Sequence, residues 1–333
     1  MVSREWLTRH QVGVYAVAVL VAIAIGLSRP GADAAVEALI EPVLAVLLYV
    51  TFLEVPFVRL RRGFADRRFM TAALGLNFLV VPVVVWTLSR ALPPDPVVRV
   101  GAFMVLLTPC IDYVIAFTDL ADGDAAQITA ATPVLLLVQL LLLPVYLWLF
   151  MGGEVAAVIE AEPFVRAFLV LIAVPLSLAW ATEAWAERSP TGRRAQDALS
   201  WLPVPMMAAT LLVVIASQLP RVRSSIDQVA AVVPVYVAFL VVMPLLARAA
   251  AGIARTDAET SRALVFTSVT RNSLVVLPLA LALPAGYELA PAVVVTQTLI
   301  ELLGMVALTR VVPVWLVPDD PAPVSVPGVG VLR

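Results

Sequence analysis

Four side chains that could take part in chemistry lie within long apolar stretches of this sequence: Cys110, Asp112, Arg271 and Glu301. A charged arginine in the middle of a membrane span costs roughly 2.5 to 3.5 kcal/mol on insertion scales, and such residues usually serve a function. Arg271 therefore needs a partner; Asp112 is the first candidate and Glu301 the competitor. Such an ion pair either locks two helices together or faces a substrate or a proton.

Cys110 is the only cysteine of the chain. A single cysteine commonly packs as a small apolar residue, but a nearby cation such as Arg271 favours the thiolate, which is the ligand form. The candidate substrate-binding set is Cys110, Arg271, Asn272 and Glu301. A second set consists of neutral polar side chains, which either contact substrate or bond to backbone carbonyls of their own helices: Thr108, Thr132, Thr267, Thr270, Ser273 and Asn77. For Asn77 we expect a bridge between helices rather than a substrate contact.

The composition argues against most other chemistry. One cysteine and one histidine, His10, cannot build a zinc cluster, a Cys–His pair or a Ser–His–Asp triad. Neither of the glycine-rich nucleotide-binding patterns occurs. We therefore expect no enzyme activity, no metal, no cofactor and no nucleic-acid partner.

Hydrophobic residues make up 62% of the 333 residues and charged residues 14%, against about 45–50% and 25% in soluble domains. A helix needs about 20 apolar residues to cross a bilayer. The sequence predicts an all-α membrane protein with ten transmembrane helices, in which the first apolar run is a helix rather than a cleaved signal. The predicted spans are 11–28, 34–56, 69–90, 98–118, 125–150, 164–186, 198–220, 228–248, 260–283 and 289–316.

Arginine supplies all 22 basic residues, and its distribution indicates the orientation. In an alternating layout of ten spans, most arginines fall on the side of the N terminus, including the group at 59–68. The positive-inside rule then predicts a multi-pass protein of the plasma membrane with both termini in the cytoplasm. The proline-rich segment 318–333 is predicted to be a disordered cytoplasmic tail.

The chain also repeats itself at an offset of about 161 residues, since NFLVVP at 77–82 resembles AFLVVMP at 238–244. An odd number of spans per unit predicts two inverted five-helix repeats, 1–155 and 156–317, with a binding site near the midplane. The same offset relates Cys110 to Arg271. Pro109 and the polar run 267–273 interrupt spans four and nine, which we expect to be broken helices that cross.

Several segments resemble the arsenite permeases of the arsenical-resistance type, which belong to the bile acid:sodium symporter superfamily. The motifs are PCIDYVIAFTDLADGD at 109–124, ALVFTSVTRNS at 263–273 and TLIELL at 298–303, with TFLEVP at 51–56 and NFLVVP at 77–82. The resemblance implies a panel and a core domain of inverted repeats and a site where helices four and nine cross. It also implies that Cys110 is the arsenite-binding thiol and Glu301 the acidic group required for transport.

The sequence departs from this family at the sodium ligands. The family has two asparagines where this chain has Arg271-Asn272, and Thr267 stands where sodium-coupled members carry a glutamate. We hypothesise that the Arg271 guanidinium takes the place of sodium and is held by Asp112. Proton coupling or uniport would then remain.

Three functions follow from this sequence. The first is a secondary transporter that exports arsenite by alternating access, coupled to protons rather than sodium. The second is a transporter of small organic anions, because an arginine suits a carboxylate or sulfonate. The third is a membrane receptor that binds without transporting.

Overall fold

The computed structural model describes residues 4–28, 34–54, 66–110, 113–158 and 169–319, and within these ranges the chain is helical with no strand. This confirms the predicted all-α class for the described residues. The first elements are α1 (Arg4–Ser28), α2 (Ala34–Glu37), α3 (Ile40–Glu54), α5 (Arg67–Gly75), η2 (Leu76–Val80), α6 (Val81–Leu88), η3 (Ser89–Ala91), α7 (Pro96–Leu106), α8 (Val114–Leu120) and α9 (Ala125–Val158). They are followed by η4 (Leu169–Ala173), α11 (Val174–Arg188), α12 (Pro190–Leu199), α13 (Pro203–Ser224), α14 (Ile226–Ala230), α15 (Val233–Ala254), α16 (Ala258–Val269), α17 (Ser273–Leu281), α18 (Ala290–Val311) and η5 (Val312–Leu316).

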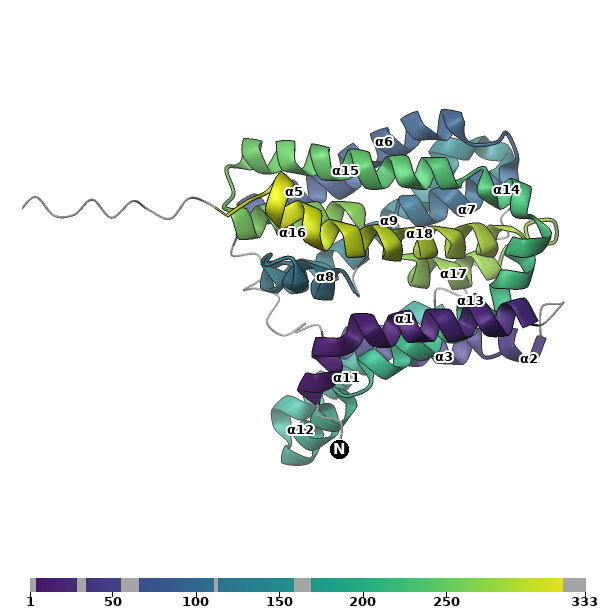
Figure 1. Cartoon of the computed structure of the whole chain (residues 1–333). Helices are drawn as coiled ribbons and strands as arrows, with labels where there is room; N and C mark the ends of the chain where they lie inside the picture. Colours follow the sequence, from purple (N-terminus) through teal and green to yellow (C-terminus); the bar gives the residue numbers. More distant parts are fainter. Residues whose placement is uncertain (1–3, 29–33, 55–65, 111–112, 159–168, 320–333) are drawn as a thin grey trace, which may run out of the picture.

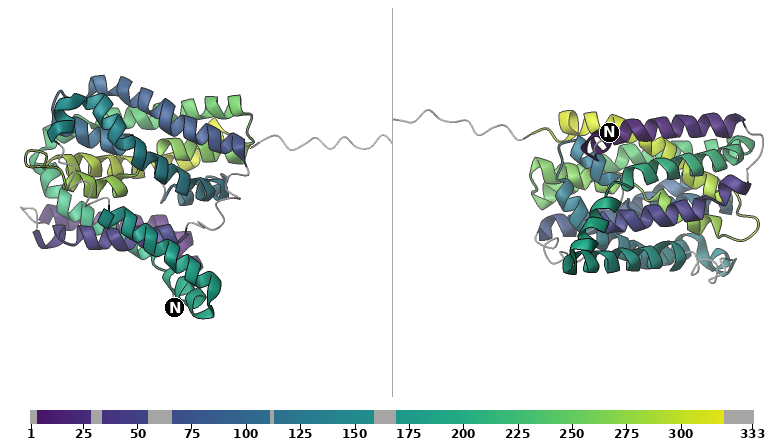
Figure 2. Two further views of the ribbon diagram at one scale, coloured as in Figure 1. Left: turned by 180° about the vertical axis from the view of Figure 1, so that it is seen from behind. Right: turned by 90° about the horizontal axis from the view of Figure 1, so that it is seen from below.

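The helices lie in two layers (Figure 1). The smaller layer contains α1, α3, α11 and α13, which pack against one another, and we call it the four-helix layer. The larger layer contains α5 to α9 and α15 to α18, and the view from behind shows the same division (Figure 2, left). The two layers meet where α13 packs against α18.

Five helical stretches of the described chain are long and apolar enough to cross a membrane: 67–91, 125–152, 203–224, 226–254 and 290–316. Shorter apolar helices cover 13–28, 40–53 and 96–106. The protein is therefore a multi-pass membrane protein, but the ten predicted spans are confirmed only in part. Predicted spans four and nine are each divided into two short helices, and predicted spans two and six extend into residues outside the described ranges.

The inverted repeats 1–155 and 156–317 remain a prediction. Most of the predicted tail, 320–333, lies outside the described residues. At its described start, Asp319 accepts a hydrogen bond from Nη2 of the buried Arg262 at 2.6 Å.

Local sequence explains where the helices of the larger layer begin. Asp66, Asp95 and Asp257 each accept hydrogen bonds from the first free backbone N–H groups of α5, α7 and α16. Pro96 follows Asp95 at the first position of α7, where the missing N–H costs nothing. A π-helical turn, η2, interrupts the helical path from α5 to α6 and includes the buried Asn77.

Helices α7 and α18 of the larger layer approach each other closely at Gly101. A Cβ atom on Gly101 would lie 2.8 Å from the Ala290 carbonyl oxygen and 3.0 Å from Cβ of Val293. Because one of these neighbours is backbone, it cannot move aside in the way a flexible side chain can. Glycine at position 101 therefore sets the distance between the two helices.

We predict that Gly101→Ala lowers the apparent unfolding temperature, because overpacking costs about 1–3 kcal/mol. The measurement is tryptophan fluorescence on heating of the purified protein in detergent. Gly75→Ala is the matched control, because Gly75 has helical dihedral angles and its Cβ would meet nothing within 4 Å. That control gains about 1 kcal/mol of helix propensity, so a Gly101 variant as stable as the Gly75 variant contradicts the prediction.

Candidate functional site

Two interrupted helical paths meet in the middle of the larger layer. One path breaks between α7, which ends at Leu106, and α8; the other breaks between α16 and α17, at Thr270, Arg271 and Asn272. The breaks fall where the sequence predicted them. The two segments pair in an antiparallel bridge, in which the Cys110 N–H donates to the Thr270 carbonyl at 3.0 Å.

A second hydrogen bond of this bridge runs from the Asn272 N–H to the Thr108 carbonyl, at 2.8 Å. Backbone N–H and C=O groups at membrane depth have no water to bond, so each break needs partners within the protein. Each broken helix supplies those partners to the other. The bridge thus fixes Cys110 beside Arg271.

The Arg271 side chain is fully buried, and one nitrogen of its guanidinium lies among three oxygens. Nη2 donates to Asn77 Oδ1 at 2.8 Å, to the Thr267 carbonyl at 3.0 Å and to the Ser268 carbonyl at 2.7 Å. All three oxygens belong to neutral groups. We call Asn77 Oδ1 and these two carbonyls the oxygen cage of Arg271.

Two further contacts hold the same guanidinium. Nη1 donates to the Leu106 carbonyl at 3.4 Å, and the guanidinium carbon lies 5.4 Å from the ring centre of Phe239 on α15. A cation over an aromatic face is attracted by the negative face of the ring. Nε has no hydrogen-bond partner in the described part of the chain.

The predicted ion pair between Arg271 and Asp112 cannot be placed, because Asp112 lies outside the described residues. Glu301, the other predicted partner, lies next to the backbone of Arg271 rather than its guanidinium. Glu301 Oε2 accepts the Arg271 N–H at 2.9 Å. Among the described carboxylates, none forms a salt bridge with the guanidinium.

Glu301 is fully buried in α18 and joins three elements. Its Oε1 accepts a hydrogen bond from the Tyr113 hydroxyl at 2.7 Å, and its Oε2 also accepts one from Nε2 of Gln297. The Tyr113 hydroxyl lies 3.3 Å from the Arg271 carbonyl as well. The carboxyl group therefore connects α18 to the start of α8 and to the break before α17.

Tyr113 and Gln297 were not predicted as site residues. A tyrosine and a glutamine give no charge signal in a sequence. The signal that could have identified Tyr113 is its place in the broken segment, directly after Asp112.

The remaining predicted residues are Cys110 and two groups of polar side chains. Cys110 is 1% exposed and sits in the crossing itself. Three hydroxyls donate to backbone carbonyls four residues earlier, so their single O–H donors are already used: Thr108, Thr132 and Thr270. Three other side chains keep a buried polar atom without a partner in the described part of the chain: Thr267 Oγ1, Asn272 Nδ2 and Ser273 Oγ.

Asn272 and Ser273 begin α17. Asn272 Oδ1 caps the helix by accepting the Val275 N–H at 3.1 Å, while its Nδ2 keeps donor capacity. Unpaired N–H groups and the helix dipole make such a terminus attractive to negative or electron-rich groups.

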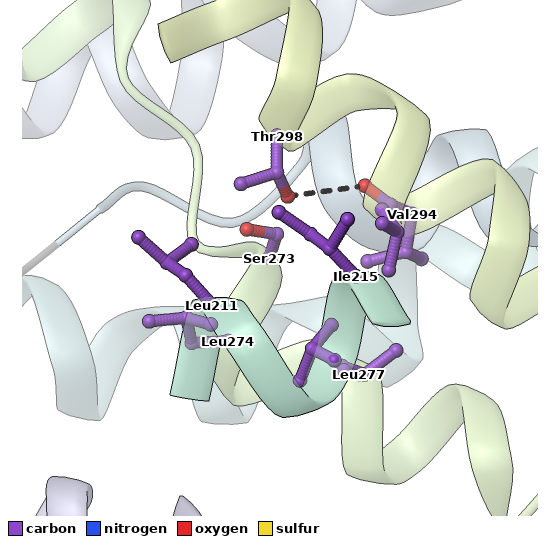
Figure 3. A pocket seen from close by; sticks show the side chains of 9 residues that line it. Leu211, Ile215, Ser273, Leu274, Leu277, Val294 and Thr298 are labelled. Carbon is purple, nitrogen blue, oxygen red and sulfur yellow. Dashed lines mark hydrogen bonds between the residues drawn. The ribbon is translucent and has the colours of Figure 1, made fainter. Parts of the chain in front are cut away.

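A small cavity lies beside this terminus, where the two layers meet (Figure 3). Its volume of about 10 Å³ is close to what one water molecule occupies. Leu211 and Ile215 of α13 line one side, and Ser273 of α17 and Thr298 of α18 line the other. Thr298 bonds to the Val294 carbonyl at 3.4 Å, so the Ser273 hydroxyl is the polar group with unused capacity here.

We predict that Asn77→Leu destabilises the protein, because Arg271 loses a side-chain acceptor and a hydrogen bond to a charged group contributes about 1.5–3 kcal/mol. The readout is the apparent unfolding temperature in detergent. Asn77→Asp is the matched control, since it keeps an oxygen for Nη2 and should unfold at a higher temperature than the leucine variant. Equal unfolding temperatures for the leucine variant and the unmodified protein would show that the cage does not depend on Asn77.

Comparison with known proteins gives one family match. The family model described as the Sodium Bile acid symporter family matches residues 41–225, which run from α3 to the end of α13. No curated protein matches the chain. The match includes Asn77 and Cys110 but stops before Arg271 and Glu301.

Proposed function

The chain belongs to the sodium bile acid symporter family, whose model covers more than half of its residues, and from this premise we propose that it is a secondary transporter that exports arsenite. Members of this family are transporters rather than enzymes. The observation that carries the proposal is the crossing of two broken helices within the larger layer, where the start of α17 faces the seam, the boundary along which α13 of the four-helix layer packs against α18. A break supplies polar backbone and helix ends at a depth where apolar helices offer none.

The proposed path runs along the seam between α13 and the α17–α18 pair. The unused hydroxyl of Ser273 lines the cavity on this seam, and Asn272, with its unused Nδ2, directly precedes it in the chain. Movement of one layer against the other would expose this region alternately to the two sides. Two inverted repeats, 1–155 and 156–317, would make the two exposures equivalent.

Arsenite is the proposed cargo because Cys110 lies in the crossing, and a thiolate is a soft ligand that suits arsenic. The carboxyl group of Glu301 is the proposed proton carrier. It is buried, and it accepts hydrogen bonds from Tyr113 of one break and from the Arg271 N–H of the other. Protonation of Glu301 would therefore change the hydrogen bonds of both breaks. The proposal includes export across the plasma membrane, with both termini in the cytoplasm.

A small organic anion is the second candidate cargo, favoured by the start of α17. A carboxylate or sulfonate placed there would meet Asn272 Nδ2, the Ser273 hydroxyl and the positive end of the helix. The Arg271 guanidinium, which the sequence suggested as the group that binds the anion, does not line this cavity. The guanidinium contacts η2, α7, α15 and α16, whereas the cavity is lined by α13, α17 and α18.

We also propose that the Arg271 guanidinium is a permanent cation that makes sodium unnecessary. Nη2 has three neutral oxygen neighbours at 2.7–3.0 Å, a surrounding that would also suit a small cation. Because the cation is covalently attached, it cannot be transported. In the same hypothesis Asp112 holds the guanidinium.

Replacing Cys110 separates the two cargoes. We predict that Cys110→Ser abolishes arsenite resistance in a sensitive host, because a hydroxyl cannot replace a thiolate as a soft ligand. Growth against arsenite concentration is the measurement, with membrane levels of the protein checked in parallel. Thr108→Ser is the matched control, since it keeps the hydroxyl that bonds the Met104 carbonyl beside the same break. Unchanged resistance in Cys110→Ser removes the thiol ligand and favours the organic anion.

Sodium independence is tested by flux into proteoliposomes under imposed gradients. We predict the same rate with and without a sodium gradient, and acceleration by a proton gradient. Glu301→Gln should lose the response to protons, and its single amide oxygen can replace only one of the two carboxylate oxygens that accept from the Tyr113 hydroxyl and from the Arg271 N–H. A strict requirement for sodium contradicts the role given to Arg271, and proton-driven flux in Glu301→Gln contradicts the role given to Glu301.

A further inference from the structure

A wide basin opens at the end of the molecule where α13 leads into α14, the right-hand end in Figure 1. Its volume is about 410 Å³. The side formed by α13 and α14 carries Arg221, Ser225 and Gln228, and the opposite side, formed by the larger layer, carries Asp95 and Glu288. The basin therefore lies on the seam between the layers, beyond the crossing.

The Arg221 side chain bonds to residues of α2 and α13, on its own side of the seam. Its Nη1 donates to Glu37 Oε1 at 3.1 Å and its Nη2 to Glu37 Oε2 at 2.9 Å, which makes the pair bidentate. Nη1 also donates to Gln218 Oε1 at 3.2 Å. The side chains of Arg221 and Glu37 are 28% and 29% exposed, so the pair is partly buried and water still reaches it.

Glu288 stands on the other side of the basin, in the turn between α17 and α18. Its Oε1 accepts the Gly286 N–H at 2.9 Å, in a turn where Gly286 has a φ of +99°. That hydrogen bond, and to a smaller degree the charge of Arg221, lower the pKa of Glu288 below its ordinary value. Glu288 is thus a carboxylate that faces the same basin as Arg221 without forming a salt bridge to it.

Asp95 is less suited to be a partner for Arg221. Its carboxylate caps α7 by accepting the Val97 N–H at 2.8 Å, so a new ion pair would compete with the start of that helix. Glu288 caps no helix of the described chain. Its turn can approach α13 if the seam narrows.

We propose that Arg221 is a two-position ionic gate, paired with Glu37 while this basin is open and with Glu288 when the layers close over it. The proposal rests on the proposed function, because it requires the layers to move. One ion pair of Arg221 is exchanged for another, so the gate sets the ratio of open to closed molecules without a large change in stability. Glu37 and Glu288 then compete for the Arg221 guanidinium. Removing the Glu37 carboxylate should favour the closed state, and removing the Glu288 carboxylate should favour the open state.

The accessibility of a thiol in the basin measures this ratio. Cys110, the only native cysteine, is buried, so Gln228→Cys adds an exposed thiol at the rim of the basin. The rate of its reaction with a membrane-impermeant maleimide is measured on the full chain in sealed proteoliposomes. We predict that Glu37→Gln slows the reaction and Glu288→Gln accelerates it, each by about five-fold, which corresponds to about 1 kcal/mol.

Arg223→Gln is the matched control, because Arg223 is exposed in the same last turn of α13 but does not line the basin. It should leave the rate unchanged. Equal rates in all variants, or a shift of the same sign for both glutamate variants, overturn the gate. The maleimide reaction needs no transported solute, so the gate and the proposed function are tested separately. Opposite shifts of the rate without solute flux would support the gate and contradict transport. Solute flux without these shifts would support transport and contradict the gate.

Discussion

Backbone groups that cannot reach water are the constraint on which this structure depends. Breaking a helix at membrane depth releases N–H and C=O groups, each of which costs several kcal/mol if left unpaired. The chain breaks two helices at one place and lets each satisfy the other, through the pairs Cys110–Thr270 and Asn272–Thr108. Either break alone would leave backbone groups unpaired, so the two breaks, which are distant in the sequence, form one structural unit.

The burial of Arg271 follows from that crossing. The end of α16 leaves the Thr267 and Ser268 carbonyls without helical partners, and these groups accept hydrogen bonds from the guanidinium three and four residues later. The π-helical turn η2 then brings Asn77 to the third position of the cage. Hydrogen bonds to a charge are roughly twice as strong as neutral ones, which offsets part of the cost of burying the cation.

Sequence reasoning located the breaks because they have local causes: Pro109 removes a donor, and polar residues at 267–273 interrupt an apolar run. It identified Arg271 and Glu301 because charges in apolar sequence are conspicuous. It did not find the backbone acceptors of Arg271, because a carbonyl oxygen belongs to every residue and leaves no signal in composition. It named Asp112 as the first partner of the Arg271 guanidinium and Glu301 as the competitor, whereas the Glu301 carboxylate accepts the backbone N–H of Arg271.

The number of spans was harder to predict for a related reason. Apolar length in sequence does not distinguish one continuous helix from two half-helices, and only five described stretches are long enough to cross a membrane alone. Spans four and nine are built from pieces such as α7 and α17, with 11 and 9 residues. Such pieces are stable only because neighbouring helices enclose them.

The crossing has two chemically different sides. The guanidinium of Arg271 is directed to α15, η2 and the end of α16, all within the larger layer. The unused hydroxyl of Ser273 instead faces α13, which belongs to the other layer. Sliding of the layers would therefore change the surroundings of Ser273 and leave the contacts of Arg271 intact. A charge that moves with its layer keeps the same solvation throughout such a motion, so it can stabilise the crossing in every state, whereas an exchangeable ion would have to be bound again in each cycle.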